Sequence, residues 1–474
     1  MTKKIIAQCI VCILSASTGL HAATIDWNSA GTDGDWNTSA SWTGDVVPGV
    51  SDLARIKQAA DVTVSASASA NKLVTGDDST ITISSAGSLT VETDVEVGNS
   101  GGVAYGTMFV DGGTLTVKNK LSLALFGDDR TGTITFNSGN ITVGVDLLSP
   151  VSDEDPTLVY NQRAVQIGGS NSGTGEVTMA GGTFKAYGKF NLGITGPGTL
   201  NLSGGTIDLT EGEWQNLEVG KNGAGTVNMT GGIIETKGLL MGKNGVTGNS
   251  NFYLDGGTLI VYGDAITLKS DSKLLIGDGV FQWQRDQWND RINPINGFIT
   301  NENITYGSPT TSGNYPDVTA EQSWTSASGA VTIYADTDEV RSGYTTVWAE
   351  SNDTDGDGYN NSVDVFPNDV NEWADADGDN VGDNADVHDG YNDTELDAYL
   401  LANNYTSDGL NEQDLIDLRV GSKLASIAND QATLQVVIEQ SNDLGSWSTL
   451  QTESVTVDAP AGTTKQFFRY RMQD

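Results

Sequence analysis

Apolar and polar side chains alternate in short runs along the N-terminal and central parts of the chain. The pattern is clearest in GTLNLSGGTIDL (Gly198–Leu209) and GTVNMTGGIIET (Gly225–Thr236), where Leu200 and Leu202 flank Asn201. Alternation with a period of two is typical of a β-strand that buries one face. Glycines close the runs, and glycine reaches turn conformations that cost other residues energy. The pattern therefore predicts short strands joined by tight corners.

These runs recur at a nearly constant interval. The second glycine of each GG-like turn falls at Gly87, Gly113, Gly139, Gly182, Gly205, Gly232 and Gly257. The steps are 23 to 27 residues, except one of 43 residues that contains an acidic insertion at 147–163. A period of about 25 residues fits one turn of a parallel β-helix. An antiparallel sandwich also has alternating strands, but the similarity between the units favours the solenoid.

The repeats lie between two tryptophan-rich stretches. Residues 23–60 carry Trp27, Trp36 and Trp42 among Gly and Asp turns. We expect them to cap the open end of a solenoid that spans 61–349, because an uncovered sheet edge is adhesive. An aromatic platform that binds sugar is the alternative. The period decays after Val261, and 273–349 is expected to hold the last coils and a C-terminal cap.

The Trp-rich opening and the GT-x-x-x-GG units resemble secreted bacterial proteins with autotransporter-associated β-strand repeats. The resemblance covers about Ile25 to Ala349. It implies a passenger-like β-helix at the cell exterior.

The first residues have the pattern of a signal peptide, at 1–22. Lys3 and Lys4 form a basic region, Ile5 to Leu14 an apolar core, and small residues precede Ala23. The core is too short to span a membrane, and no later run is apolar enough. We therefore expect a secreted or cell-surface protein with no transmembrane segment after cleavage.

Charge and composition exclude several classes of function. The formal net charge of −38 would repel nucleic acid and anionic membranes. Both cysteines, Cys9 and Cys12, fall within the signal peptide, and His388 is the one histidine beyond it. Thiol chemistry and Ser-His-Asp catalysis are therefore not expected. Extracellular polysaccharide or cell-envelope components remain as partners.

Two Asp-rich loops carry the strongest chemical signal. Asp353–Asp364 reads DTDGDGYNNSVD and Asp375–Asp386 reads DADGDNVGDNAD. The D-x-D-x-D spacing brings several oxygens together from one short loop, as Ca²⁺ requires. Gly358 and Asn380 at the sixth position both tolerate a left-handed turn. The expected ligands are Asp353, Asp355, Asp357, the Tyr359 carbonyl, Asn361 and Asp364, then Asp375, Asp377, Asp379, the Val381 carbonyl, Asp383 and Asp386.

An acidic disordered linker is the alternative, but it does not explain the same spacing twice. EF-hands and dockerins place an apolar residue at position eight, where this chain has Asn360 and Gly382, and Phe366-Pro367 follows the first loop. Residues 350–390 instead resemble thrombospondin type 3 repeats. The resemblance implies that the same aspartates bind calcium in a segment with little regular structure, which we expect to be a compact spacer with metal and extended without it.

The predicted fold class is therefore all-β, with a parallel β-helix rod and an Asp-rich calcium-binding linker. A short helical pair at 391–422 and a small antiparallel β-domain at 423–474 complete it. Strands are expected at Gln431–Gln440, Trp447–Leu450, Ser454–Asp458 and Lys465–Met472. His388 is expected to face solvent.

Two classes of function fit these features. The first is a non-catalytic structural or adhesive protein outside the cell. The alternative is a β-helix that binds or degrades polysaccharide, and its best catalytic candidates are Asp286, Asp290 and Arg291 beside Trp283 and Trp288. The clean repeats present Thr, Asn and Ser outward, with no paired acids that recur in register. We therefore expect no enzyme activity.

Overall fold

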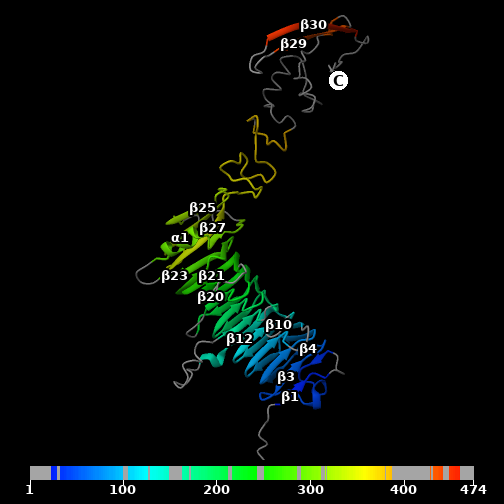
Figure 1. Ribbon diagram of the computed structural model, residues 1–474, viewed down its shortest axis with the longest axis vertical. Coiled ribbons are helices and arrows are strands. Elements are labelled where there is room, and N and C mark those ends of the chain that lie inside the picture. The colour runs from blue at the N-terminus through cyan, green and yellow to red at the C-terminus, as the bar shows by residue number, and fades with distance from the viewer. Residues whose placement is uncertain are drawn as a thin grey trace, which may run out of the picture. The chain divides into compact units, whose positions relative to one another are not determined.

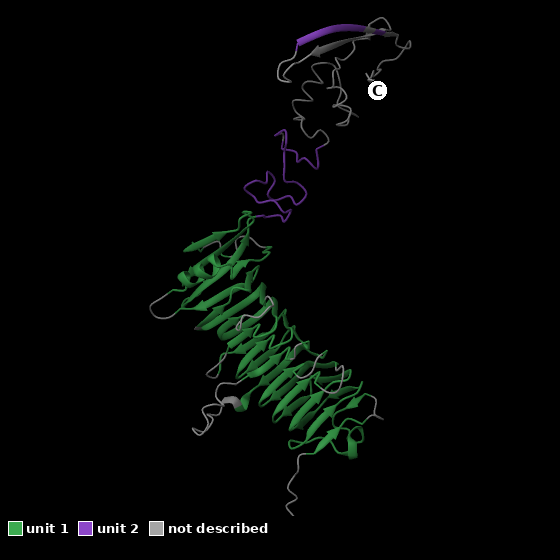
Figure 2. Cartoon of the chain, viewed as in Figure 1, with its two compact units in different colours: residues 1–352 green, residues 353–474 purple. Residues whose placement is uncertain are grey.

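The computed structural model describes residues 23–28, 33–99, 105–125, 129–148, 163–169, 172–211, 216–242, 250–285, 290–310, 315, 318–378, 380–386, 427–428, 431–440 and 448–458. The chain divides into two compact units, Met1–Asn352 and Asp353–Asp474 (Figure 2). Several predicted features lie outside the described residues: the signal peptide at 1–22, the short helical pair at 391–422 and most of the insertion at 147–163. The same holds for Asp286, Trp288, Asp379 and His388.

The first unit is a parallel β-solenoid of about 9 turns (Figure 1), as predicted. Its strands belong to one continuous 27-stranded sheet, in which strands of one coil pair in parallel with their equivalents in the next coil. The strands are β1 (Thr24–Asp26), β2 (Gly34–Asp35), β3 (Leu53–Ile56), β4 (Asp61–Val64), β5 (Ser67–Ala70), β6 (Lys72–Thr75), β7 (Ser79–Ser84), β8 (Ser88–Val91), β9 (Asp94–Val97), β10 (Tyr105–Val117), β11 (Lys120–Leu123), β12 (Thr131–Val143), β13 (Arg163–Ile167), β14 (Thr174–Met179), β15 (Thr183–Ala186), β16 (Lys189–Leu192), β17 (Gly198–Leu202), β18 (Thr206–Leu209), β19 (Asn216–Val219), β20 (Gly225–Met241), β21 (Ser250–Leu268), β22 (Ser272–Ile276) and β23 (Val280–Gln284). Short 3₁₀ turns lie at η1 (Ser39–Ser41), η2 (Thr43–Asp45) and η3 (Val145–Leu148). The parallel pairing excludes the antiparallel sandwich.

The core of the solenoid consists of columns of like residues. In one column the register stacks Ile81, Met108, Ile134, Val177, Leu200, Val227 and Phe252, all buried. The alternate positions point outward and hold mostly Thr and Asn. Each inward face is covered only by neighbouring coils, so the coils stabilise one another.

Glycine is required at the corners for two different reasons. Gly205 has φ of 82°, in the left-handed region that only glycine occupies freely. Gly198 lies elsewhere on the backbone map, but a Cβ there would lie 2.4 Å from the Gly193 nitrogen and 2.6 Å from the Ile167 oxygen. The GT glycine of each repeat is therefore selected by the close approach of adjacent backbone.

The N-terminal tryptophans form the core of the first coil. Trp27, Trp36 and Trp42 are all buried, and Trp42 meets the other two edge to face at centroid distances of 4.9 and 4.8 Å. Trp42 Nε1 donates to the Trp36 carbonyl at 2.7 Å. The sugar-platform alternative is therefore wrong for these three rings, because a platform needs an exposed face.

An antiparallel hairpin and one helix close the other end of the solenoid. The segments are α1 (Ile292–Thr300), β24 (Ile304–Tyr306), β25 (Gln322–Thr325), β26 (Val331–Thr337) and β27 (Tyr344–Ser351). β27 pairs antiparallel with both β23 and β26, and so ends the parallel stack. The region 273–349, expected to hold the last coils and a C-terminal cap, ends within β27, whereas α1 was not predicted.

In the second unit, residues 353–386 form turns and bends with no helix or strand among the described residues. β28 (Ile427–Ala428), β29 (Gln431–Gln440) and β30 (Ser448–Asp458) make a three-stranded antiparallel sheet. The strands expected at Trp447–Leu450 and Ser454–Asp458 are joined in β30. The strand expected at Lys465–Met472 lies outside the described residues.

Candidate metal centre

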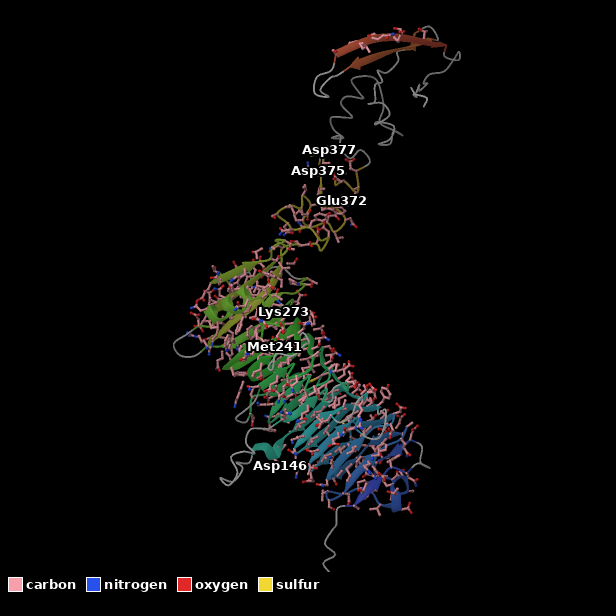
Figure 3. The ribbon with its side chains drawn as sticks, in the orientation of Figure 1. Asp146, Met241, Lys273, Glu372, Asp375 and Asp377 are labelled. Carbon is pink, nitrogen blue, oxygen red and sulfur yellow. The ribbon has the colours of Figure 1, made fainter. Side chains whose placement is uncertain are left out.

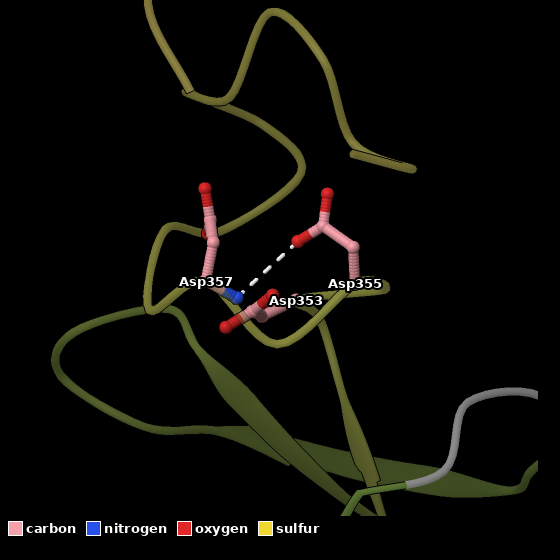
Figure 4. A group of neighbouring side chains, drawn as sticks. All are labelled: Asp353, Asp355 and Asp357. Atoms are coloured by element: carbon pink, nitrogen blue, oxygen red, sulfur yellow. Dashed lines mark hydrogen bonds between the residues drawn. The ribbon is translucent and has the colours of Figure 1, made fainter. Parts of the chain in front are cut away.

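The first Asp-rich loop brings three carboxylates to one point. One carboxylate oxygen from each of Asp353, Asp355 and Asp357 lies within 4.8 Å of the other two (Figure 4). Across this group, Asp357 N–H donates to Asp355 Oδ1 at 3.3 Å. No other group of three potential ligands of this type is found among the described residues. Three like charges at this separation repel, so the group favours a cation.

The backbone of the loop turns around Asp353. Asp353 Oδ1 accepts a hydrogen bond from Gly356 N–H at 2.8 Å, and its Oδ2 accepts one from Gly358 N–H at 2.9 Å. Both glycines have left-handed φ, 82° and 97°. Asn361 Oδ1 accepts the Thr354 N–H at 2.9 Å. The D-x-D-x-D-G spacing therefore places the Asp353 carboxylate at the centre of the turn.

The second loop repeats this geometry 22 residues later. Asp375 accepts the Gly378 and Asn380 N–H groups at 2.7 and 3.0 Å. Asn380 has φ of 70°, which confirms the left-handed turn predicted at position six. Figure 3 shows Asp375 and Asp377 on this segment, near Glu372. Asp379, the ligand expected at position five, lies outside the described residues.

Buried carboxylate oxygens make the first loop a candidate for binding a cation. Oδ2 of Asp355, of Asp357 and of Asp364 is buried with no hydrogen-bond partner. Asp364 as a whole is only 7% exposed. A buried, unpaired carboxylate oxygen costs free energy that a hard cation would recover.

The other predicted ligands take different places. Asp364 is not part of the three-carboxylate group, and its Oδ1 accepts the Phe366 N–H at 2.7 Å. Tyr359 stacks on Trp373, with ring centroids 4.9 Å apart and an interplanar angle of 4°. This stack joins the turn of the first loop to the start of the second. The expected ligands Val381, Asp383 and Asp386 lie in the second loop, among the residues that the structure describes.

Sequence reasoning missed Glu372. This side chain is 6% exposed, and its Oε2 accepts the Asn384 N–H at 2.9 Å. Residues 353–386 contain eleven acidic and no basic side chains. A glutamate precedes the first aspartate of each loop by three positions, at Glu350 and Glu372, and this repeat was the available signal.

The described members of the alternative catalytic set have structural contacts. Arg291 is 8% exposed, its Nε donates to the Gln284 carbonyl at 3.0 Å, and its guanidinium lies 4.8 Å from the centre of the Trp283 ring. Asp290 Oδ1 accepts the Ile292 N–H at 3.0 Å and so supports the first turn of α1. Trp283 is itself buried. These three residues connect α1 to the last coil.

Fold and site together place the chain in the class of parallel β-solenoid proteins with an acidic, candidate metal-binding segment. Comparison with known protein families, with curated proteins and with solved structures finds no match to this chain. Among the described residues, none of the helices has the length and apolar character needed to cross a membrane.

Proposed function

We propose that this is an exported, non-catalytic structural or adhesive protein of the cell surface or extracellular space, whose acidic segment is a calcium-stabilised spacer. The observation that supports it most is the group at Asp353, Asp355 and Asp357, in which the buried Oδ2 atoms of Asp355 and Asp357 lack hydrogen-bond partners. The regular solenoid is suited to a scaffold because its outward positions are mostly small and polar.

Calcium would be held by oxygen atoms that the turn of the loop brings together. In the first loop these are the carboxylates of Asp353, Asp355 and Asp357, with the Tyr359 carbonyl, Asn361 and Asp364 completing the expected set. Bound Ca²⁺ supplies positive charge to a segment that has no basic side chain of its own. Its removal leaves mutual repulsion between carboxylates, which favours an extended chain.

A calcium-binding measurement with a matched control tests this proposal. Equilibrium dialysis of the full chain should show bound calcium, and the double substitution Asp355→Asn with Asp357→Asn should remove the first site. Asp369→Asn is the control, because Asp369 is exposed and lies between the loops. Absence of calcium binding to the unsubstituted chain would overturn the proposal, as would equal loss in the control.

Partners follow from the same proposal. Extracellular polysaccharide or cell-envelope components are the candidates that an exported, strongly acidic rod leaves open, and nucleic acid is not among them. A glycan array with calcium present, run beside reducing-end assays on acidic polysaccharides, separates binding from cleavage. Cleavage would overturn the non-catalytic part of the proposal.

A further inference from the structure

The two Asp-rich loops share one backbone design. Asp353 and Asp375 accept equivalent pairs of N–H groups, as described above. The turn before position twelve is also the same: Asp364 N–H donates to the Asn360 carbonyl at 2.9 Å, and Asp386 N–H donates to the Gly382 carbonyl at 2.8 Å. Differences between the loops can therefore be compared position by position.

The first difference lies at position nine. In the first loop the amide oxygen of Asn361 accepts the Thr354 N–H at 2.9 Å. In the second loop the carboxylate of Asp383 accepts the equivalent Ala376 N–H at 2.7 Å. The contact is conserved between the loops, but the second loop carries one more negative charge.

The second difference concerns the N–H of position ten. In the first loop Ser362 N–H donates to the side-chain oxygen of Asn360 at 2.8 Å. In the second loop Asn384 N–H donates to Glu372 Oε2 at 2.9 Å. Residue 382 has no side chain to do this, and a Cβ there would lie 2.1 Å from Glu372 Oε2. The missing side chain of Gly382 thus leaves the space that the Glu372 carboxylate fills.

In both cases an equivalent backbone N–H donates to a neutral amide oxygen in the first loop and to a carboxylate in the second loop. Glu372 is more than nine-tenths buried, and no ion pair compensates it among the described residues. A buried, uncompensated carboxylate is costly. It becomes favourable next to a bound cation, and the affinity of Ca²⁺ loops rises with the number of ligand charges.

We propose that the two loops are unequal calcium sites: the second, with Glu372 and Asp383, binds more tightly and fills first. This inference rests on the proposed function, since it assumes that both loops bind calcium. Glu372 acts here as a positioning residue, because its carboxylate holds the backbone at Asn384 and adds charge beside the loop.

Calcium titration of the full chain by isothermal calorimetry tests the inequality. The unsubstituted chain should show two dissociation constants. Glu372→Gln keeps a hydrogen-bond acceptor and removes the charge, so it should weaken the tighter constant by about tenfold, and Asp383→Asn should do the same. The reciprocal change Asn361→Asp should tighten the weaker constant by about tenfold.

A double substitution separates charge from structure. Gly382→Asn together with Glu372→Ala empties the space beside residue 382 and gives the second loop the amide acceptor of the first loop, so the backbone contact can form without the carboxylate. The inference predicts that the two constants then approach one another. If Glu372→Gln, Asp383→Asn and the double substitution all leave the tighter constant unchanged, the inference is wrong while the proposed calcium function stands. If the unsubstituted chain binds no calcium, the proposed function itself fails.

Discussion

The clearest test of the solenoid is a pair of glycine-to-alanine substitutions that the structure predicts to have opposite signs. Gly198 is the first residue of a GT repeat unit, where β17 begins. An added Cβ would lie 2.4 Å from the Gly193 nitrogen and 2.6 Å from the Ile167 oxygen, both backbone atoms. The backbone angle at Gly198 is not left-handed, so the substitution tests space alone.

The magnitude follows from how little those atoms can move. Gly198 N–H donates to the Ala224 carbonyl at 3.0 Å, and Gly193 N–H donates to the Ile167 carbonyl at 2.9 Å. Real Cβ atoms do not approach backbone atoms this closely, so a corner held on both sides must shift. Overpacking of a well-packed core costs about 1–3 kcal/mol, and we expect Gly198→Ala to reach the upper end of this range.

Gly297 provides the matched control. It lies within α1, and a Cβ there would meet nothing within 4 Å. Alanine is favoured over glycine in a helix by about 1 kcal/mol, so Gly297→Ala should stabilise the protein slightly. Urea unfolding followed by far-ultraviolet circular dichroism gives both free-energy changes. A Gly198→Ala protein within about 0.5 kcal/mol of the unsubstituted chain would refute the close approach of coils.

Further predictions concern the end of the rod and one ion pair. Trp36→Ala should destabilise the solenoid by about 3–5 kcal/mol, because it removes a fully buried ring, and should leave any glycan binding on an array unchanged. Burial raises the pKa of Asp208, but hydrogen bonds from Thr210 and from the Lys185 ammonium outweigh it and leave that pKa below its ordinary value. The stability that Asp208 contributes is therefore present above its ordinary pKa of about 4 and is lost as pH falls through the folded-state pKa. Asp208→Asn should accordingly destabilise the chain in urea at neutral pH, and this destabilisation should shrink as pH falls below about 4. An effect of the same size at every pH would show that the charge has no role.

The fold was largely predictable because its rules are local and repeated. Alternation and glycine spacing define one coil, and parallel stacking then places equivalent residues such as Leu200 and Val227 in one column. The helix α1 was not predictable, since its sequence INPINGFIT contains Pro294 and Gly297, which are poor helix formers. It depends on tertiary contacts: Ile295 is fully buried, and Asp290 accepts the first N–H.

The candidate site was predictable where it depends on spacing within one loop. The three-carboxylate group and the left-handed turn at Asn380 both follow from the D-x-D-x-D pattern. The position of Glu372 does not, because it accepts an N–H twelve residues further along the chain, at Asn384. The place of Asp364 was also not predictable from spacing alone. Its Oδ1 accepts the Phe366 N–H, and Asp364 does not join the three-carboxylate group.

In the proposed function, calcium sets the length of the acidic spacer. Small-angle scattering of the full chain, with calcium in excess and then with a chelator, measures this directly. We expect a larger maximum dimension after chelation. We expect no such change when Asp355 and Asp357 are both replaced by asparagine and the second loop carries Asp375→Asn and Asp377→Asn. An envelope of the unsubstituted chain that is the same with and without calcium would contradict a calcium-dependent spacer.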